Sequence, residues 1–154
     1  MNYQLIDKSH AKEIGKLAVL LTNEIIERTG SNCFDIDEEL AVDLCTSYLS
    51  SGLYSVIAAF DNLDIIGFCA LCESQSLYAQ GSFGIIQEFY ILPIYRSQGV
   101  GKHLISSAIQ FSKTKKWKRL ELCTPSIPEF NRTCDFYQKN GFEITGGYKM
   151  KYET

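Results

Sequence analysis

A glycine-rich turn near the middle of the sequence is the segment best suited to hold a charged ligand. It follows an apolar run at residues 83–92 and leads into a helical pattern at residues 99–115. Glycine allows a tight turn with inward-pointing amides, and a helix N-terminus adds unpaired N–H groups and about half a positive charge. A pyrophosphate can bind such a turn without a dedicated basic side chain. The candidate contacts are Arg96, Ser97, Gln98, Gly99, Val100, Gly101 and Lys102.

Two known phosphate-binding motifs do not fit this turn. A P-loop requires Gly-x-x-x-x-Gly-Lys-Ser/Thr, but the first glycine is absent here and His103 follows Lys102. A dinucleotide-binding fingerprint requires a third glycine at the position of Leu104. On the glycines alone, a simple turn into a helix explains the segment as well as an anion site does.

The residues around the turn resemble motif A of the GCN5-related N-acetyltransferases, the GNAT superfamily. That motif reads Arg/Gln-x-x-Gly-x-Gly/Ala, and its defined positions correspond here to Arg96, Gly99 and Gly101. The family often has glycine directly after the arginine, whereas this chain has Ser97, which still offers its backbone amide. A second stretch, residues 131–142, resembles motif B of the same family, including its Phe-Tyr and Gly-Phe pairs.

The resemblance implies a fold, an acyl donor and a place for that donor. The fold is a mixed α/β (α+β) GNAT fold, with a mostly antiparallel central sheet of roughly six to seven strands and about four helices. The donor is acetyl-CoA, with its pyrophosphate on the turn and its pantetheine arm along the strand at Phe89, Tyr90 and Ile91. An amide at Tyr90 or Ile91 would polarise the thioester carbonyl. Asn131 is implied as a cofactor contact, with a helix N-cap as its equally good alternative.

Acetyl transfer requires a neutral amine, and this requirement points to Glu88. An amine with a pKa of about 10.4 is unprotonated in only about one molecule in 2,500 at pH 7, which costs about 4.6 kcal/mol. Glu88 interrupts an apolar run at residues 85–92 and matches an acidic position of several family members. It is therefore the candidate base, acting directly or through water, and the alternative is a structural glutamate.

Tyr137 aligns with a family tyrosine that faces the departing CoA sulfur as a general acid. Proton transfer from a phenol of pKa about 10 to a thiolate of pKa about 8.5 is uphill by roughly 2 kcal/mol. A hydrogen bond that stabilises the thiolate is therefore the alternative role for Tyr137. The neighbouring Phe136 is expected in the core, and none of these residues implies a metal.

A sheet and helices are needed to position these side chains, and the hydrophobic pattern indicates both. Asp7 and Asp35 are candidate caps of two N-terminal helices, the second with Glu38 as a capping-box partner. The expected helices are residues 7–30, 35–51, 99–115 and 131–140. A short apolar segment at 3–6 precedes expected strands at 53–60, 65–71, 83–92 and 120–123 and a final hairpin at 142–152.

Composition and charge limit the class of protein and its partners. The chain has 154 residues, 45% hydrophobic and 21% charged, so we expect a single globular domain over residues 1–154. A net charge of −3 argues against nucleic acid as a partner, and no apolar run is long enough to cross a membrane. The mixed polar N-terminus and the lack of such a run favour a cytoplasmic protein, and without a secretory context the six cysteines are expected to be free thiols.

Charge is distributed unevenly along the chain. Five acids lie within residues 35–43, and in the family that the chain resembles the acceptor enters near this segment. These acids would attract a cationic amine as the acceptor. The alternative is that they are the acids that commonly stabilise the N-terminus of a helix. Five bases within residues 113–119 are expected at a solvated helix end rather than on RNA. Cys69 and Cys72 are expected to have neither a redox nor a metal role, because a strand points them to opposite faces.

The leading hypothesis is therefore an acetyl-CoA-dependent N-acetyltransferase that transfers acetyl directly to a primary amine of a small molecule or peptide. The alternative is a GNAT-fold module that binds or senses CoA with little turnover. The identity of the amine is left open, and a homodimer is among the oligomeric states left open.

Overall fold

The computed structural model describes residues 1–31 and 35–154, which divide into two compact units, Met1–Leu122 and Cys123–Thr154. Each unit is described by itself, so the expected single domain stays a prediction. The first unit contains β1 (Asn2–Ile6), the 3-10 turn η1 (Lys8–His10), α1 (Ala11–Thr29), α2 (Glu38–Ser51), β2 (Ser55–Asp61), β3 (Asp64–Ser76), β4 (Gly81–Ile91), the 3-10 turn η2 (Pro93–Tyr95), α3 (Val100–Thr114) and β5 (Leu120–Leu122). The second unit contains α4 (Asn131–Lys139).

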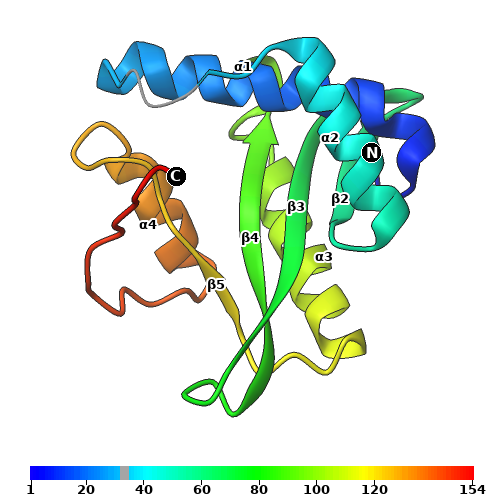
Figure 1. The fold of residues 1–154 in the computed structure, drawn as a ribbon. Helices are drawn as coiled ribbons and strands as arrows, with labels where there is room; N and C mark the ends of the chain where they lie inside the picture. Colours follow the sequence, from blue (N-terminus) through cyan, green and yellow to red (C-terminus); the bar gives the residue numbers. More distant parts are fainter. Residues whose placement is uncertain (32–34) are drawn as a thin grey trace. The chain divides into compact units, whose positions relative to one another are not determined.

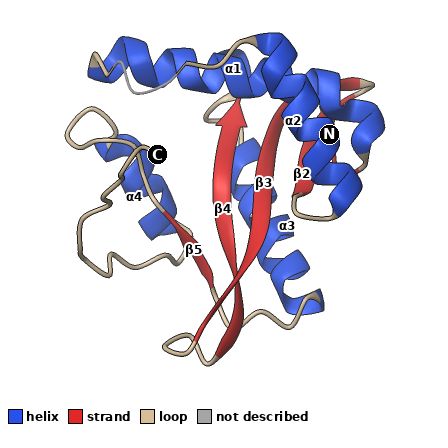
Figure 2. Cartoon of the chain, in the orientation of Figure 1, coloured by secondary structure: helices blue, strands red, loops and turns tan. Residues whose placement is uncertain are grey.

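One five-stranded sheet, in the order β1-β2-β3-β4-β5, organises the first unit (Figures 1 and 2). The first four strands are antiparallel neighbours, and β5 runs parallel to β4. The expected turn between residues 60 and 65 is confirmed as the β2–β3 connection. The expected mixed α/β architecture is therefore confirmed: the described residues form four α-helices and a sheet of five strands, in place of the expected six to seven.

The missing strands belong to the C-terminal hairpin expected at residues 142–152, and that expectation is wrong. Both Gly146 and Gly147 have positive φ, at 85°, but the residues on either side of them form no strand. An isolated two-stranded hairpin is only marginally stable in water. Here the side chains that would form its apolar face are exposed, namely Ile144, Tyr148, Met150 and Tyr152.

Helices cover both faces of the sheet in the first unit. One face packs against α1 and α2, and its core combines alternate residues of β2 and β3 with apolar residues of the helices. The intervening residues point to the opposite face, where α3 packs against β2 and β3. In Figure 1, α3 lies behind β3 and β4. The buried α3 residues include Val100, Leu104, Ile105 and Ala108.

The two N-terminal acids act differently from the expectation. Asp7 caps η1, where its carboxylate accepts from the Ser9 amide at 2.8 Å, and α1 begins only at Ala11. The cap of α2 is Asp37 rather than Asp35, with its carboxylate accepting from the Leu40 amide at 2.7 Å. The helices themselves form where the apolar spacing predicted them.

Candidate active site

The glycine-rich turn has the backbone conformation of an anion-binding loop. Ser97 and Gly99 both have positive φ, at 63° and 86°, and Gly99 is the N-cap of α3. The first N–H groups of a helix have no intrahelical acceptor, so the amides at the start of α3 are available to a ligand. Residues 97–99 and Lys102 are exposed, while Val100 is buried and Gly101 half-buried. The turn therefore fits a pyrophosphate bound mainly through backbone amides.

Gly99 is needed for its conformation rather than for space. A Cβ atom added there would meet only the His103 ring, at 3.9 Å, which is ordinary contact. The left-handed φ instead disfavours any residue with a side chain. Ser97 adopts a similar φ without being glycine, so the departure from the family pattern at this position has a conformational cost of about 1 kcal/mol.

Arg96 was predicted to contact the cofactor, but the structure directs its guanidinium to α1. Its Nη1 and Nη2 atoms donate to the two carboxylate oxygens of Glu24 at 2.9 and 2.6 Å. Its Nε donates to the carbonyl of Ile91 at 2.8 Å, and the guanidinium lies 5.2 Å from the centre of the Tyr90 ring. Glu24 also accepts from Arg28, one turn later in α1, at 3.3 Å.

Glu24 was missed by the sequence analysis because the only local signal is its spacing to Arg28. Its partner Arg96 is 72 positions away in the chain. Hydrogen bonds from Arg96 lower the pKa of Glu24 below its ordinary value, in spite of partial burial. The pair is therefore ionised at neutral pH.

Two further side chains hold the segment between β4 and α3. The Tyr95 hydroxyl donates to the Asp61 carboxylate at the end of β2, at 3.2 Å. Gln98, predicted as a ligand, donates through Nε2 to the Ile94 carbonyl at 2.6 Å, which folds its side chain back onto the segment. Its contribution to an anion site would then come from its backbone amide.

A β-bulge lies directly before the predicted base. In the pairing of β3 with β4, Ala70 is opposite Glu88 and Leu71 is opposite Ile86. Gln87 therefore has no partner in β3 and is the extra residue of the bulge. The parallel pairing of β5 with β4 covers residues 84–86 and ends there. β4 itself continues to Ile91, so Phe89, Tyr90 and Ile91 lie beyond the last β5 pair. Bulges of this kind redirect side chains at functional sites.

Glu88 lies half-buried on the face of the sheet that α1 and α2 cover, opposite Ala70 of the core. The hydroxyl of Tyr54, a residue just before β2, donates a short hydrogen bond to Oε2 of Glu88. Burial raises the pKa of Glu88 above its ordinary value, and the hydrogen bond from Tyr54 opposes this rise. A carboxylate of raised pKa can accept a proton more readily near neutral pH.

Tyr54 was also missed by the sequence analysis, because it stands 34 positions before Glu88 at the edge of an apolar run. Its ring packs against Tyr48 of α2, with centroids 5.3 Å apart. Burial and the nearby Glu88 carboxylate raise the pKa of Tyr54, so it stays a hydrogen-bond donor at neutral pH. The two residues form a carboxylate–phenol pair.

Three thiols, Cys45, Cys69 and Cys72, interact electrostatically with a member of this pair. Cys45 of α2 is buried, and burial together with the Glu88 charge raises its pKa to about 11. Cys69 is buried with a raised pKa, and half-buried Cys72 accepts from Gln87 Nε2 at 3.1 Å. The cysteines of the described residues carry free thiols, and Cys33 lies outside those residues. Within the described ranges, no group of His, Cys, Asp and Glu side chains could hold a metal ion.

The second unit holds the other two predicted site residues. Asn131 is the first residue of α4, and Phe130 occupies the N-cap, so the N-cap interpretation of Asn131 is wrong. Tyr137 is buried, with edge-on ring contacts to Phe136 at 5.3 Å and Phe142 at 5.6 Å between centroids. Asn131 and Tyr137 belong to the second unit and Glu88 and the turn to the first, so a shared site of these residues stays a prediction.

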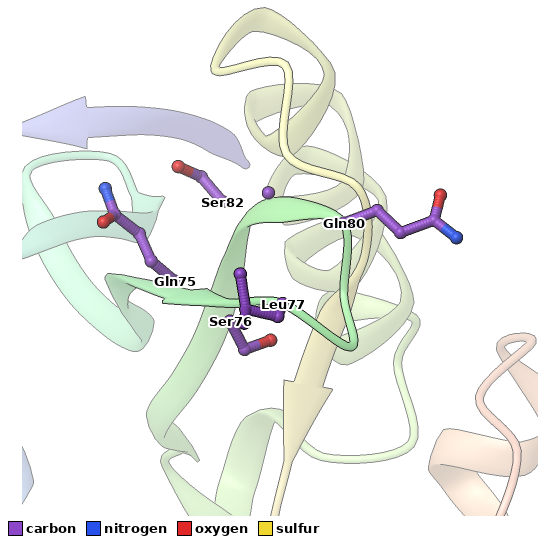
Figure 3. A pocket seen from close by; sticks show the side chains of 6 residues that line it. Gln75, Ser76, Leu77, Gln80 and Ser82 are labelled. Atoms are coloured by element: carbon purple, nitrogen blue, oxygen red, sulfur yellow. The ribbon is translucent and has the colours of Figure 1, made fainter.

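A hollow at the tip of the β3–β4 hairpin is separate from these residues (Figure 3). It is lined by Gln75, Ser76, Leu77, Gln80, Gly81 and Ser82, none of which titrates. Ser82 lies six positions before Glu88 in β4, which corresponds to about 20 Å of strand. The hollow therefore contributes nothing to the carboxylate–phenol pair.

Comparison with known proteins decides the family. A model of the acetyltransferase (GNAT) domain matches residues 52–144, more than half of the chain. The chain belongs to the GNAT acetyltransferase family. No curated protein sequence matches it.

Solved structures of other GNAT proteins share the fold at low sequence identity. A ribosomal-protein-alanine N-acetyltransferase from Brucella melitensis biovar Abortus 2308 is 16% identical, with a TM-score of 0.73, over 99% of this chain and 100% of that one. The aminoglycoside N-acetyltransferase AAC(6')-Iy in complex with CoA is 17% identical, with a TM-score of 0.78, over 99% and 93%. A predicted acetyltransferase with acetyl-CoA from Clostridium acetobutylicum is 18% identical, with a TM-score of 0.72, over 98% and 95%.

None of the helices in the described part of the chain combines the length and hydropathy needed to cross a membrane.

Proposed function

We propose that this GNAT domain is an acetyl-CoA-dependent N-acetyltransferase that acts on a primary amine of a small molecule or peptide. The observation that carries the proposal is that Glu88 lies on β4 and that the turn follows the same strand along the chain. The carboxylate of raised pKa lies three residues, or about 10 Å, before the end of β4, and the anion-binding turn follows that end. A base and an anion site in one continuous segment suit a reaction between a phosphorylated donor and an amine.

The donor site is proposed to follow the strand into the turn. The backbone amides of Ser97, Gln98, Gly99 and the start of α3, at Val100, Gly101 and Lys102, would bind the pyrophosphate. Phe89, Tyr90 and Ile91 would line the pantetheine arm beyond the last β5 pair, and a backbone amide at Tyr90 or Ile91 would donate to the thioester oxygen. Arg96 would contribute indirectly, by holding the turn in place. Asn131, in the second unit, would add a side-chain contact to the cofactor.

Glu88 is proposed to prepare the acceptor. It takes a proton from the substrate ammonium, directly or through water, so that the neutral nitrogen can attack the acetyl carbonyl carbon. Acetyl-CoA supplies the activated thioester as substrate. As its C–S bond breaks, the CoA thiolate leaves with the bonding electrons and the acetylated nitrogen loses its second proton to solvent, which gives a neutral amide. Tyr137 would donate a proton or a hydrogen bond to that sulfur. The Tyr54 hydroxyl holds Oε2 of Glu88, which leaves Oε1 for the amine.

A cationic amine is the proposed acceptor class. Three acids at the start of α2, Asp37, Glu38 and Glu39, are exposed, and Asp35 precedes them. Asp37 also caps α2, so its carboxylate would both stabilise the helix and attract a cationic acceptor. The fold is shared with acetyltransferases named for aminoglycosides and for a ribosomal-protein alanine, which supports small-molecule and peptide amines alike. A cytoplasmic location remains part of the proposal.

The test is release of CoA thiol from acetyl-CoA with a panel of polyamines, aminoglycosides, amino acids and peptides. We expect acetyl transfer to at least one amine, and a loss of at least about 100-fold in kcat/KM for Glu88→Gln. CoA binding without turnover on any amine would instead support a CoA-binding or sensing module. An absence of CoA binding in calorimetry would overturn both functions.

A further inference from the structure

We infer that Glu24 is a positioning residue of the donor site and that it acts through Arg96 to preorganise the turn that binds the pyrophosphate. The inference rests on the proposed acetyl-CoA function. It concerns a residue of α1, outside both sequence motifs and outside the matched residues 52–144.

Arg96 is held at three points, each on a different side of its guanidinium. The Ile91 carbonyl accepts from Nε at the end of β4, and the two Glu24 oxygens accept from Nη1 and Nη2. The guanidinium carbon lies over the Tyr90 ring, 5.2 Å from its centroid. Two parallel N–H···O bonds between Arg and a carboxylate fix orientation as well as distance. Arg96 therefore links the strand end to α1 with little freedom.

The residue after this link is the first one of the turn. Arg96 is in extended conformation and Ser97 switches to a positive φ of 63°, which disfavours a serine. A conformation of this kind persists only when the surrounding structure holds it. The backbone of Arg96 also donates to the Pro93 carbonyl at 3.2 Å, so both its side chain and its main chain hold the start of the turn.

The surroundings favour a structural pairing over direct phosphate binding by Arg96. Its side chain is 37% exposed and that of Glu24 is 22% exposed, so the pair is only partly screened by water. The guanidinium folds back to the carbonyl of Ile91, five residues earlier, and its two terminal nitrogens are both occupied by the Glu24 carboxylate. An arginine without a carboxylate partner at this position would bind phosphate through its charge. Arg96, whose charge is balanced by Glu24, contributes instead by holding the backbone.

Glu24→Gln is the test, with Glu27→Gln as the matched control on an exposed position of the same helix. We expect Glu24→Gln to weaken CoA binding in calorimetry about fivefold or more, because preorganisation is lost. Glu27→Gln should bind CoA as the wild type does. A double variant Glu24→Gln/Arg96→Gln should bind no more weakly than Arg96→Gln alone, since both changes break one link.

A truncated donor separates positioning of the turn from general structural damage. Acetyl-pantetheine lacks the diphosphate, so its KM should be the same in folded Glu24→Gln and in the wild type, while the KM for acetyl-CoA rises. An equal rise for both donors, unchanged CoA affinity, or tighter CoA binding by the released Arg96 would overturn the inference. Failure of the wild type itself to bind CoA would instead count against the proposed function.

Discussion

Replacement of Tyr54 by phenylalanine should raise the pKa of Glu88. In the wild type, the Tyr54 hydroxyl stabilises the ionised carboxylate, whereas burial favours the neutral acid. Phenylalanine removes the donor but keeps the ring that packs on Tyr48. A hydrogen bond to a charged group contributes about 1.5–3 kcal/mol. At about 1.36 kcal/mol per pH unit, the lower bound moves the Glu88 titration upward by about one pH unit.

The direct assay is ¹³C NMR titration of glutamate side-chain carboxyls, with the Glu88 signal assigned by its loss in Glu88→Gln. This measurement needs neither donor nor acceptor. In kinetics, the acid limb of kcat/KM should move in the same direction, because the base must be ionised to accept a proton. Tyr54→Phe should then be slower than the wild type at neutral pH and approach it at higher pH.

The same change has a signature in stability. Burial places the pKa of Glu88 in the folded protein above its unfolded value, so the folded state binds the proton more tightly. The free energy of unfolding therefore falls as the pH rises from the unfolded pKa through the folded pKa. Tyr54→Phe should extend this fall to higher pH, which denaturant unfolding at about pH 5 and about pH 8 can measure.

Tyr48→Phe is the control, because it removes a hydroxyl from the neighbouring ring of the same aromatic pair. We expect it to leave the Glu88 titration in place. If the Glu88 signal of a folded Tyr54→Phe protein titrates at the wild-type pH, or at a lower one, the reasoning is refuted. Such a result would mean that the hydroxyl does not stabilise the ionised carboxylate.

Two further substitutions test the turn and the second unit. Gly99→Asp should weaken CoA binding, measured by calorimetry, more than Gly99→Ala does. Both variants disfavour the left-handed φ, but only aspartate adds a negative charge beside the phosphates. Equal losses of affinity would show that the charge has no effect. Tyr137→Phe should lower kcat while CoA binding is retained, since it removes a hydroxyl and keeps the ring contacts of a buried side chain; wild-type turnover would contradict a role at the sulfur.

The sequence predicted those parts of the fold that depend on local pattern. The strands expected at 53–60 and 65–71 form as β2 and β3 and pair with each other, because the two apolar runs and the turn between them are adjacent in the chain. The expected hairpin at 142–152 does not form. Its strands depend on a partner strand as well as on their own pattern, and pairing with a distant strand leaves no local signal.

The candidate site shows the same division. The turn at 97–102 and Glu88 could be proposed as candidates, since glycines before a helix and an acid inside an apolar strand are visible in the sequence. Tyr54 and Glu24 could not, because each contributes through one contact across the fold. For Arg96, the motif indicated a ligand and the structure shows an ion pair, since the motif does not specify where the side chain points.

The residues that hold the site come from outside the motifs, and this limits what the motifs alone can do. The family match begins at residue 52, so it includes Arg96 but neither Glu24 nor the helix that carries it. Without α1 and α2, the face of the sheet formed by Val56, Ala58, Phe68 and Ala70 would lose the helical residues that cover it. Arg96 would lose both carboxylate oxygens in the same step. The glycine-rich turn is therefore supported by α1, through Arg96, as well as by its own glycines.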